Sequence, residues 1–167
     1  MRRWTTIVAA FALLLTPACN KKKEANDTLA PMDHVVRTPT PAPRSVLRKT
    51  FTVDTYVAFP VDVPIHSHSP SLKGNFASYR YQSTGGRISD DAASIDLLLL
   101  DDKQYETFTH GPSEDITRSA QSSHEQAIDW ALGATTDLPR KYYLVFNNST
   151  GKPKTKLVDA DFTLTFE

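Results

Sequence analysis

The segment from Val158 to Glu167, VDADFTLTFE, alternates apolar and polar residues without a break. Successive side chains of a β-strand point to opposite faces, so this pattern predicts a strand with one buried face and one face in solvent. Strands of this kind belong to antiparallel sheets that cover a core on one side only. The fold must therefore contain a half-exposed antiparallel sheet.

Other short apolar stretches precede this segment, and turn-forming residues separate them. They are FTVDTYVAFPV (51–61), KGNFASYRYQ (73–82), SIDLLLLDD (94–102), AIDWAL (127–132) and KYYLVFNN (141–148). The nearly continuous apolar run at 95–100 predicts a strand that is buried on both faces. Strands without a long helical period favour an all-β fold, an antiparallel, jelly-roll-like β-sandwich over residues 49–167.

The segments between these stretches have their own signals. Residues 102–110 are expected to form one short helical turn that Asp101 or Asp102 caps and Gly111 ends. The proline-containing residues 61–71 are expected to be a loop or an edge strand. The polar residues 112–126 show no period, which predicts a long loop.

Composition limits the function classes. The chain has 167 residues with 19 basic and 19 acidic side chains, so it carries no net charge. No basic stripe is present, and a nucleic-acid partner is not expected. A single cysteine excludes an intramolecular disulfide and the usual cysteine-pair zinc motifs. A domain of about 120 residues is large enough to bury a core without disulfides.

Residues 1–18 have the organisation of an export signal. Met1–Thr6 contains two arginines, Ile7–Leu15 is an uninterrupted apolar run, and the small residue Ala18 precedes Cys19. A helix needs about 20 apolar residues to cross a bilayer, so this run is too short to span one. A basic start, a short apolar run and a small residue before the cleavage point predict a secretory signal.

The segment LLLTPAC that ends at Cys19 resembles the lipobox of bacterial lipoproteins. Ala18 and Cys19 match the family pattern, whereas Thr16 stands where the family usually has leucine. The resemblance implies that the signal is cut before Cys19 and that its sulfur is diacylated. Two or more acyl chains anchor a protein stably to a membrane. An ordinary secretory signal with a cysteine at this place by chance is the alternative.

Residues 19–48 are expected to form a lipidated, disordered tether. Three lysines, KKK at 21–23, would meet anionic headgroups, and TPTPAP at 38–43 favours extended chain. We therefore expect an extracytoplasmic, lipid-anchored protein of the bacterial cell envelope, whose membrane partner is reached through the N-terminal lipid. Under the sorting rule of lipoproteins, Asn20 in place of aspartate favours the outer membrane where two membranes are present.

The phrases IDLLLLDDKQYETFTHG, KYYLVFNNS and DADFTLTFE look like those of small extracytoplasmic β-sandwich accessory domains of bacteria and archaea. These domains are jelly-roll-like and broadly similar to the Golgi-dynamics (emp24-type) domain. The resemblance covers about residues 50–167 and rests on structural motifs. It implies binding or assembly outside the cytoplasm.

His66 and His68 in the sequence HSHS are the candidate metal ligands. Two imidazoles at this spacing lie on the same side of an extended segment and could begin a metal site with Asp62. Two ligands do not complete a site, and solvated loop residues are the alternative. No metal or other cofactor is therefore expected.

Six aromatic residues are candidates for a stacking platform that binds sugars or peptides: Tyr79, Tyr81, Tyr105, Trp130, Tyr142 and Tyr143. Of these, Tyr105, Trp130 and Tyr142 are the favoured binding residues. Burial in the core is the alternative for these aromatic residues. No G-x-S-x-G motif is present, and acylation would remove the one thiol, so no catalytic residue is assigned.

Taken together, these signals predict a lipid-anchored, non-catalytic envelope protein that acts as a binding or scaffolding module. Its expected partners are envelope proteins or glycans, and the polar residues 112–126 are the expected contact region because loops carry most recognition. The alternatives are an envelope carbohydrate-binding module and a metal-dependent hydrolase that uses His66 and His68.

Overall fold

The computed structural model describes residues 40–111, 115–149 and 155–167 of the chain, all within one unit, Arg37–Glu167. The expected signal peptide and Cys19 lie outside these residues. The described elements, in chain order, are β1 (Arg44–Val53), β2 (Tyr56–Val63), β3 (Ser71–Tyr81), β4 (Arg87–Ile88), the 3₁₀ turn η1 (Asp91–Ala93), β5 (Ile95–Asp101), α1 (Asp102–His110), β6 (Arg118–Ser123), β7 (Glu125–Ala131), β8 (Arg140–Asn147) and β9 (Lys156–Thr165).

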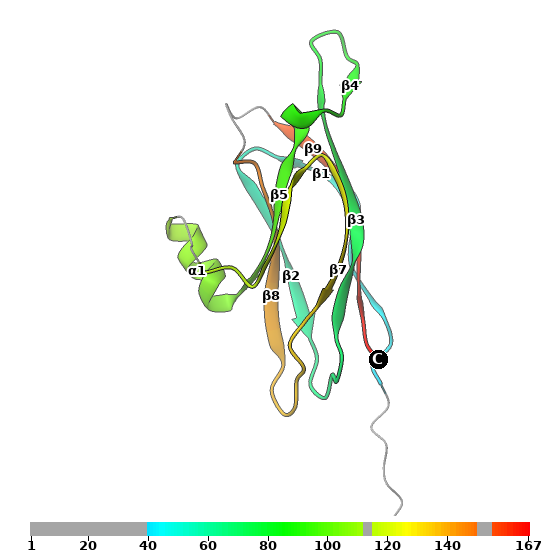
Figure 1. Ribbon diagram of the computed structural model, residues 1–167, viewed down its shortest axis with the longest axis vertical. Helices are drawn as coiled ribbons and strands as arrows, with labels where there is room; N and C mark the ends of the chain where they lie inside the picture. Colours follow the sequence, from blue (N-terminus) through cyan, green and yellow to red (C-terminus); the bar gives the residue numbers. More distant parts are fainter. Residues whose placement is uncertain (1–39, 112–114, 150–154) are drawn as a thin grey trace, which may run out of the picture. The chain divides into compact units, whose positions relative to one another are not determined.

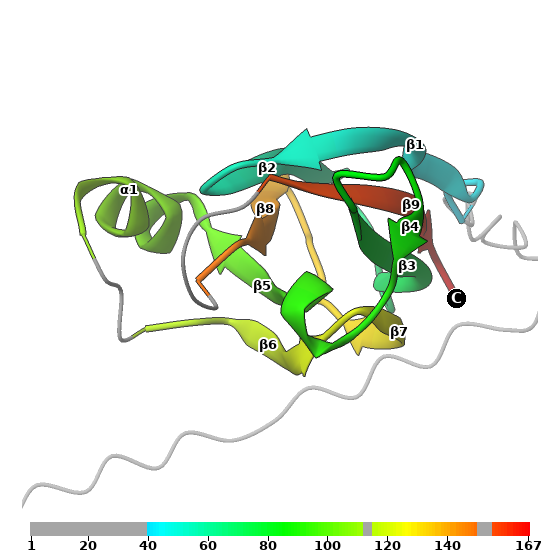
Figure 2. The same cartoon turned by 90° about the horizontal axis from the view of Figure 1, so that it is seen from above.

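The strands form two antiparallel sheets that face each other (Figures 1 and 2). The first sheet has the order β1-β9-β3-β7, and the short β4 pairs with β3 beyond the end of β7. The second sheet has the order β2-β8-β5-β6. The chain crosses repeatedly between the sheets, so neighbours in each sheet come from distant parts of the sequence, which is the jelly-roll arrangement. The predicted all-β sandwich is confirmed.

Phe146 of β8 lies at the centre of the core between the sheets. Its ring meets the edges or faces of Phe51, Phe76 and Phe162 from the first sheet at centroid distances of 5.0, 5.7 and 6.0 Å. Phe59 of β2 joins this cluster at 6.0 Å. Aromatic pairs in this geometry stabilise a fold by about 0.5–1.5 kcal/mol each beyond the burial of their area. One residue thus ties three strands of the opposite sheet to β8.

The alternating segment at the end of the chain is β9, as expected. Val158, Ala160, Phe162 and Leu164 are buried, and the residues between them are partly exposed. β9 lies between β1 and β3, so its backbone is paired on both sides.

The helix α1 explains why β5 is apolar on both faces. Leu98 and Leu100 of β5 point away from the main core, and Tyr105 and Phe108 of α1 pack over them. The helix begins with a capping box: Asp101 accepts the backbone N–H of Gln104 at 2.8 Å, and the Gln104 side chain accepts the Asp101 N–H at 2.9 Å. The expected helical turn at 102–110 and its cap at Asp101 are confirmed.

The first strand begins earlier than the domain boundary expected at residue 49. β1 starts at Arg44, directly after the prolines, and residues 44–48 pair with the last part of β9. Leu47 is buried in the core at 4% exposure, so this part of the expected tether belongs to the sandwich.

The polar segment expected to be a loop at 112–126 instead contains β6 and the first residues of β7. β6 lies at the edge of its sheet, and among the described strands it pairs with β5 alone. Ala120 is its one apolar residue at the core, so the sequence RSAQSS lacks the alternation of a half-buried strand. Residues 112–114 lie outside the described part of the chain.

The segment 61–71 divides between strand and loop. β2 continues to Val63 and β3 begins at Ser71, so the loop is limited to residues 64–70. β2 lies at the edge of its sheet, which agrees with the expected edge strand. Because an edge strand pairs on one side only, β2 can contain Pro60, which has no backbone N–H to donate. None of the helices within the described ranges has the length and apolar character that a membrane crossing requires.

Gly74 gives a direct test of how closely β3 and β9 approach each other. A Cβ atom at this position would contact the backbone oxygen of Asp161 and come within 2.7 Å of the Phe162 Cα. Gly74→Ala should lower the free energy of unfolding by at least about 2 kcal/mol in urea denaturation, because the backbone of a central strand cannot move away freely. Gly86→Ala is the control, since a Cβ there meets only the Gln82 side chain at 3.8 Å. Equal stability of both variants would contradict this packing.

Candidate functional site

The outer surface of the first sheet contains an open hollow of about 650 Å³. We call it the outer-face hollow; the side chains that line it are those of Arg48, Thr50, Asn75, Ala77, Glu125, Ala127, Asp159 and Asp161. Asn75 lies opposite Ala127, and Ala77 lies opposite Glu125, in the pairing of β3 with β7. Ala77 and Ala127 have small side chains that project little from the sheet, whereas the longer side chains of β1 and β9 project further beside them.

The charged side of the hollow follows from strand register. The alternation of β9 places Asp159 and Asp161 on its solvent face, and the pairing with β1 puts Thr50 and Arg48 opposite them. Arg48 Nε lies 3.0 Å from Asp161 Oδ2, and the Thr50 hydroxyl donates a hydrogen bond to Asp159. Exposed ion pairs stabilise a fold by only about 0–1 kcal/mol, so these groups can exchange partners with a ligand at little cost.

Tyr79 and Tyr81 follow Ala77 on the same face of β3, beyond the residues that line the hollow. The Arg87 guanidinium lies 4.1 Å from the Tyr79 ring centroid, and the Tyr81 ring meets Tyr79 edge-on at 5.9 Å. Burial, together with the nearby Asp159 carboxylate, raises the pKa of the Tyr79 hydroxyl. Tyr81 remains 53% exposed and is the accessible aromatic ring on this side.

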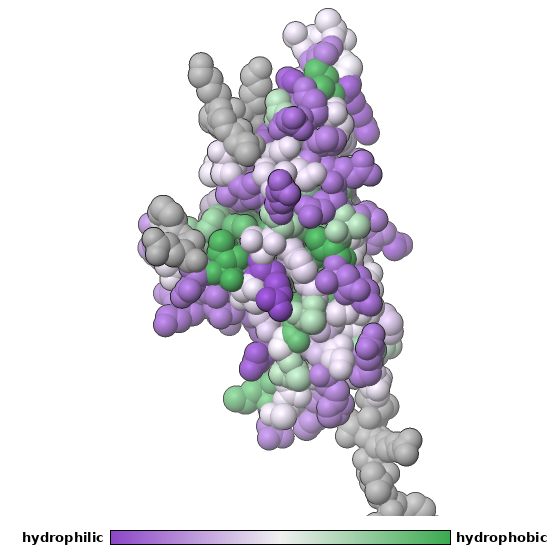
Figure 3. Space-filling model, viewed as in Figure 1, coloured by the Kyte–Doolittle hydropathy of each residue, from purple (hydrophilic) through white to green (hydrophobic). Residues whose placement is uncertain are grey.

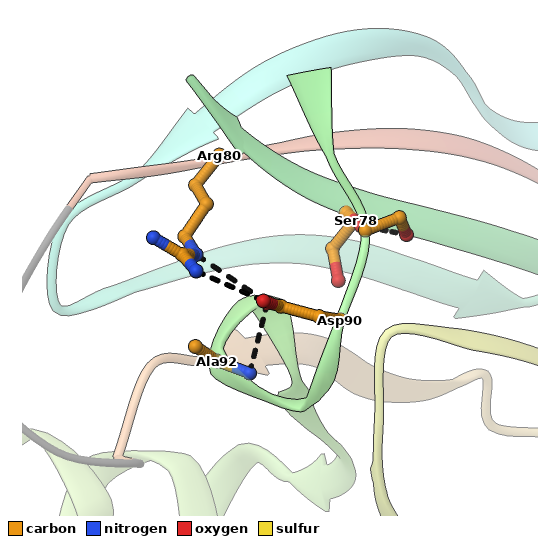
Figure 4. Close-up of polar contacts among 5 residues, drawn as sticks. Ser78, Arg80, Asp90 and Ala92 are labelled. Carbon is orange, nitrogen blue, oxygen red and sulfur yellow. Dashed lines mark hydrogen bonds and ion pairs between the residues drawn. The ribbon is translucent and has the colours of Figure 1, made fainter. Parts of the chain in front are cut away.

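Arg80 points away from this face and fixes the connection from β3 to β5 (Figure 4). Its guanidinium lies 2.9 Å from Asp90 Oδ2, and Asp90 also caps η1 through the backbone N–H of Ala92 at 3.1 Å. The hydrogen bond from Arg80 lowers the pKa of the Asp90 carboxyl. Ser78 donates to the Ala93 carbonyl at 2.6 Å. These contacts hold the crossover in place and do not line the hollow.

The three favoured aromatic candidates from the sequence do not form one platform. Tyr142 is buried at 5% exposure, and its hydroxyl accepts the Gly133 N–H at 3.3 Å. Trp130 packs against the main core from β7. Tyr105 belongs to the cluster under α1, where it stacks on Tyr143 at 3.9 Å and burial raises its pKa. The structure therefore places Tyr142 in the core rather than on a binding surface, because alternation in β8 turns it toward the opposite sheet.

His66 and His68 lie in the loop between β2 and β3, with both side chains exposed. Ser67 between them is fully buried and donates to the Pro64 carbonyl at 2.8 Å. Within the described ranges, no three histidine, cysteine or acidic side chains gather as a metal site requires. The described structure thus supplies no third ligand to this pair.

Neither a protein-family model nor a curated protein matches the chain. The fold and the surface of the described residues are therefore the basis for inferring its function.

Sequence reasoning did not find the outer-face hollow because its residues come from four strands that are far apart in the chain. One signal was available: the alternation in residues 158–167 already assigned Asp159 and Asp161 to the solvent face. The register that brings Arg48 and Asn75 beside them is set only by the pairing of β9 with β1 and β3.

Lys156, at the start of β9, is a buried cation that the sequence pattern did not reveal. Its side chain is 2% exposed, and its Nζ donates to the Ser94 carbonyl at 2.6 Å. Burial lowers the pKa of Lys156, and the Asp96 carboxylate partly opposes this effect. The folded protein therefore holds the proton on Lys156 less tightly than the unfolded chain does.

Lys156→Met should keep or raise the urea midpoint at pH 7, because burying a charge destabilises the native state and methionine fills a similar volume. As the pH rises from the lowered folded pKa to the ordinary value of 10.5, only the unfolded chain keeps the proton, so wild type gains stability relative to the variant. Denaturation curves at pH 7 and pH 10 measure this difference. If wild type loses stability relative to the variant between pH 7 and pH 10, the assignment is refuted.

Proposed function

We propose that the protein is a lipid-anchored, non-catalytic module of the bacterial cell envelope that binds its partner through the outer-face hollow. The observation that carries this proposal is the hollow itself, an open concavity on a rigid sheet with charged groups of both signs. Its volume lies within the usual range of about 300–1,000 Å³ for ligand sites. Sites on strands hold their side chains in more defined positions than sites on loops.

The side chains of the hollow favour a ligand with many hydroxyl or amide groups. The carboxylate of Asp161 and the guanidinium of Arg48 each offer two or more hydrogen-bonding atoms in one plane, and the exposed amide of Asn75 adds a donor and an acceptor. Further along the same face of β3, beyond the residues that line the hollow, Tyr81 offers an exposed aromatic ring. Envelope glycans combine such hydroxyl and amide groups with apolar ring faces, so we favour a glycan strand over a protein as the ligand.

The arrangement supports binding rather than chemistry. None of the described side chains that line the hollow is a histidine, cysteine or serine. The hydroxyl of Thr50 donates to Asp159, and Asp161 is paired with Arg48. These four polar groups thus already have partners that a ligand would replace.

The support for a lipid anchor is the N-terminal sequence pattern that ends at Cys19. Anchoring confines the domain to a surface and raises its effective concentration toward other envelope components, so a weak ligand contact becomes sufficient. The localisation that follows is extracytoplasmic, with the outer membrane favoured in a cell that has two membranes.

An intact mass of the protein extracted from cells tests the anchor. We expect a chain that begins at Cys19 and carries the added mass of two or three acyl chains. Cys19→Ser should lose this mass and leave the membrane fraction. A mature wild-type chain with an unmodified Cys19 would overturn the anchor.

Co-sedimentation with purified peptidoglycan sacculi tests the glycan ligand. Asn75→Trp fills the floor of the hollow and should abolish binding, whereas Ser119→Trp, at an exposed position of β6 in the other sheet, should bind like wild type. Circular dichroism shows whether both variants remain folded. Sacculi that fail to sediment wild-type protein would remove this ligand class.

A photo-crosslinking residue at position 75 then tests the protein alternative in whole cells. A discrete protein adduct at position 75 that is lacking at position 119 would identify a protein partner of the hollow. Equal labelling at the two positions would contradict the hollow as a recognition site.

A further inference from the structure

One end of the sandwich bears two exposed apolar side chains on neighbouring loops. The loop 64–70 connects β2 with β3, and the loop 132–139 connects β7 with β8; together we call them the tip. Ile65 is 46% exposed and Leu138 is 77% exposed. Figure 1 places both loops at the lower end of the domain, and Figure 3 shows apolar side chains at this end.

The two loops of the tip are held together by backbone hydrogen bonds. His66 donates its N–H to the Thr136 carbonyl at 2.9 Å, and Thr135 donates to the Ser67 carbonyl at 2.9 Å. The buried Thr135 hydroxyl also accepts the Ser67 N–H at 2.9 Å. These hydrogen bonds join the two loops into one unit, from which Ile65 and Leu138 are exposed.

A second hollow lies beside the tip and contains charged groups of both signs. It measures about 590 Å³ and is lined by Pro139, next to Leu138, and by the charged residues Asp101, Asp102, Lys103, Arg140 and Lys141. Cations and carboxylates at the edge of an apolar projection complement a zwitterionic lipid headgroup, which carries a phosphate and an ammonium. The same cations alone would favour an anionic surface, but the two aspartates in the lining and Asp137 in the tip offset them.

The described chain also enters the domain at this end. β1 begins at Arg44, opposite the last residues of β9 and near the start of β3. The 39 residues that precede the described part include Cys19 and the apolar run at 7–15. A membrane anchor at Cys19 therefore connects to the sandwich at the end that carries the tip.

We propose that the tip is a membrane-contact site, in which Ile65 and Leu138 enter the headgroup region of a zwitterionic bilayer. This inference rests on the lipid anchor of the proposed function. The anchor keeps the tip close to the bilayer at high effective concentration, so two apolar side chains are sufficient for contact. The contact orients the domain with the β3–β4 turn away from the bilayer and the outer-face hollow open to the side.

Spin-label depth measurements on the full-length anchored protein test this proposal. Cys19 is the only native cysteine and its sulfur is acylated, so one introduced cysteine takes the nitroxide. Thr136→Cys places the label in the tip, and Thr84→Cys places it in the exposed β3–β4 turn as the control. The protein is reconstituted into phosphatidylethanolamine–phosphatidylcholine vesicles, and sedimentation with the vesicles is recorded. Power saturation compares the collisions of the nitroxide with oxygen, which enters lipid, and with a nickel chelate, which stays in water.

We expect oxygen collisions to dominate at position 136 and nickel collisions at position 84. Adding Ile65→Asp and Leu138→Asp to the Thr136→Cys protein should shift its label to the nickel-dominated state while the protein still sediments. This variant keeps both the acyl anchor and the outer-face hollow, so it isolates the tip.

Three results would overturn the proposal. If the protein sediments with the vesicles but nickel collisions dominate at both positions, the tip does not contact the membrane, although the anchor is present. A label at position 136 that neither reagent reaches would show that a protein segment, rather than lipid, covers the tip. If wild-type protein stays in the supernatant, the lipid anchor is absent, and the tip contact that depends on it is refuted as well.

Discussion

The packing of Phe146 between the sheets is the contact on which the rest of the structure depends. Its ring reaches from β8 to phenylalanines on β1, β3 and β9, which are three neighbouring strands of the opposite sheet. Sheets bury only one face each, so a domain without disulfides must hold its layers together through such apolar contacts. The outer surfaces are then free to carry polar groups.

The two outer faces have different uses. The second sheet covers part of its outer face with α1, whose Tyr105 and Phe108 bury Leu98, Leu100 and Val145. The first sheet leaves its outer face open, and the cross-strand pairs Arg48–Asp161 and Thr50–Asp159 lie there beside two alanines. The helix α1 covers part of the outer face of the second sheet, whereas the outer face of the first sheet has an open polar hollow. We therefore assign recognition to the first sheet.

Particular elements show how far the sequence alone could predict this structure. The alternation in β9, the doubly buried β5 and the capped helix α1 are local patterns, and the structure confirms each of them. The prediction of a loop where β6 lies was wrong, because an edge strand with one apolar contact has no periodic pattern to detect. Tyr105, Trp130 and Tyr142 lie in separate places, because sequence spacing gives the face of an element on which a residue lies but not which sheet or layer that face meets.

The sequence by itself determined the fold class, the solvent side of Asp159 and Asp161, and the N-terminal pattern that predicts a lipid anchor at Cys19. These follow from periodicity and residue order, which act over a few neighbouring residues. The tertiary structure decided which strands pair, and hence that Arg48, Asn75 and Asp161 meet in one hollow and that the loops of Ile65 and Leu138 share one end. Strand pairing in this jelly roll joins segments more than a hundred residues apart, as in β1 and β9. Its register depends on the packing of the whole core rather than on any local pattern.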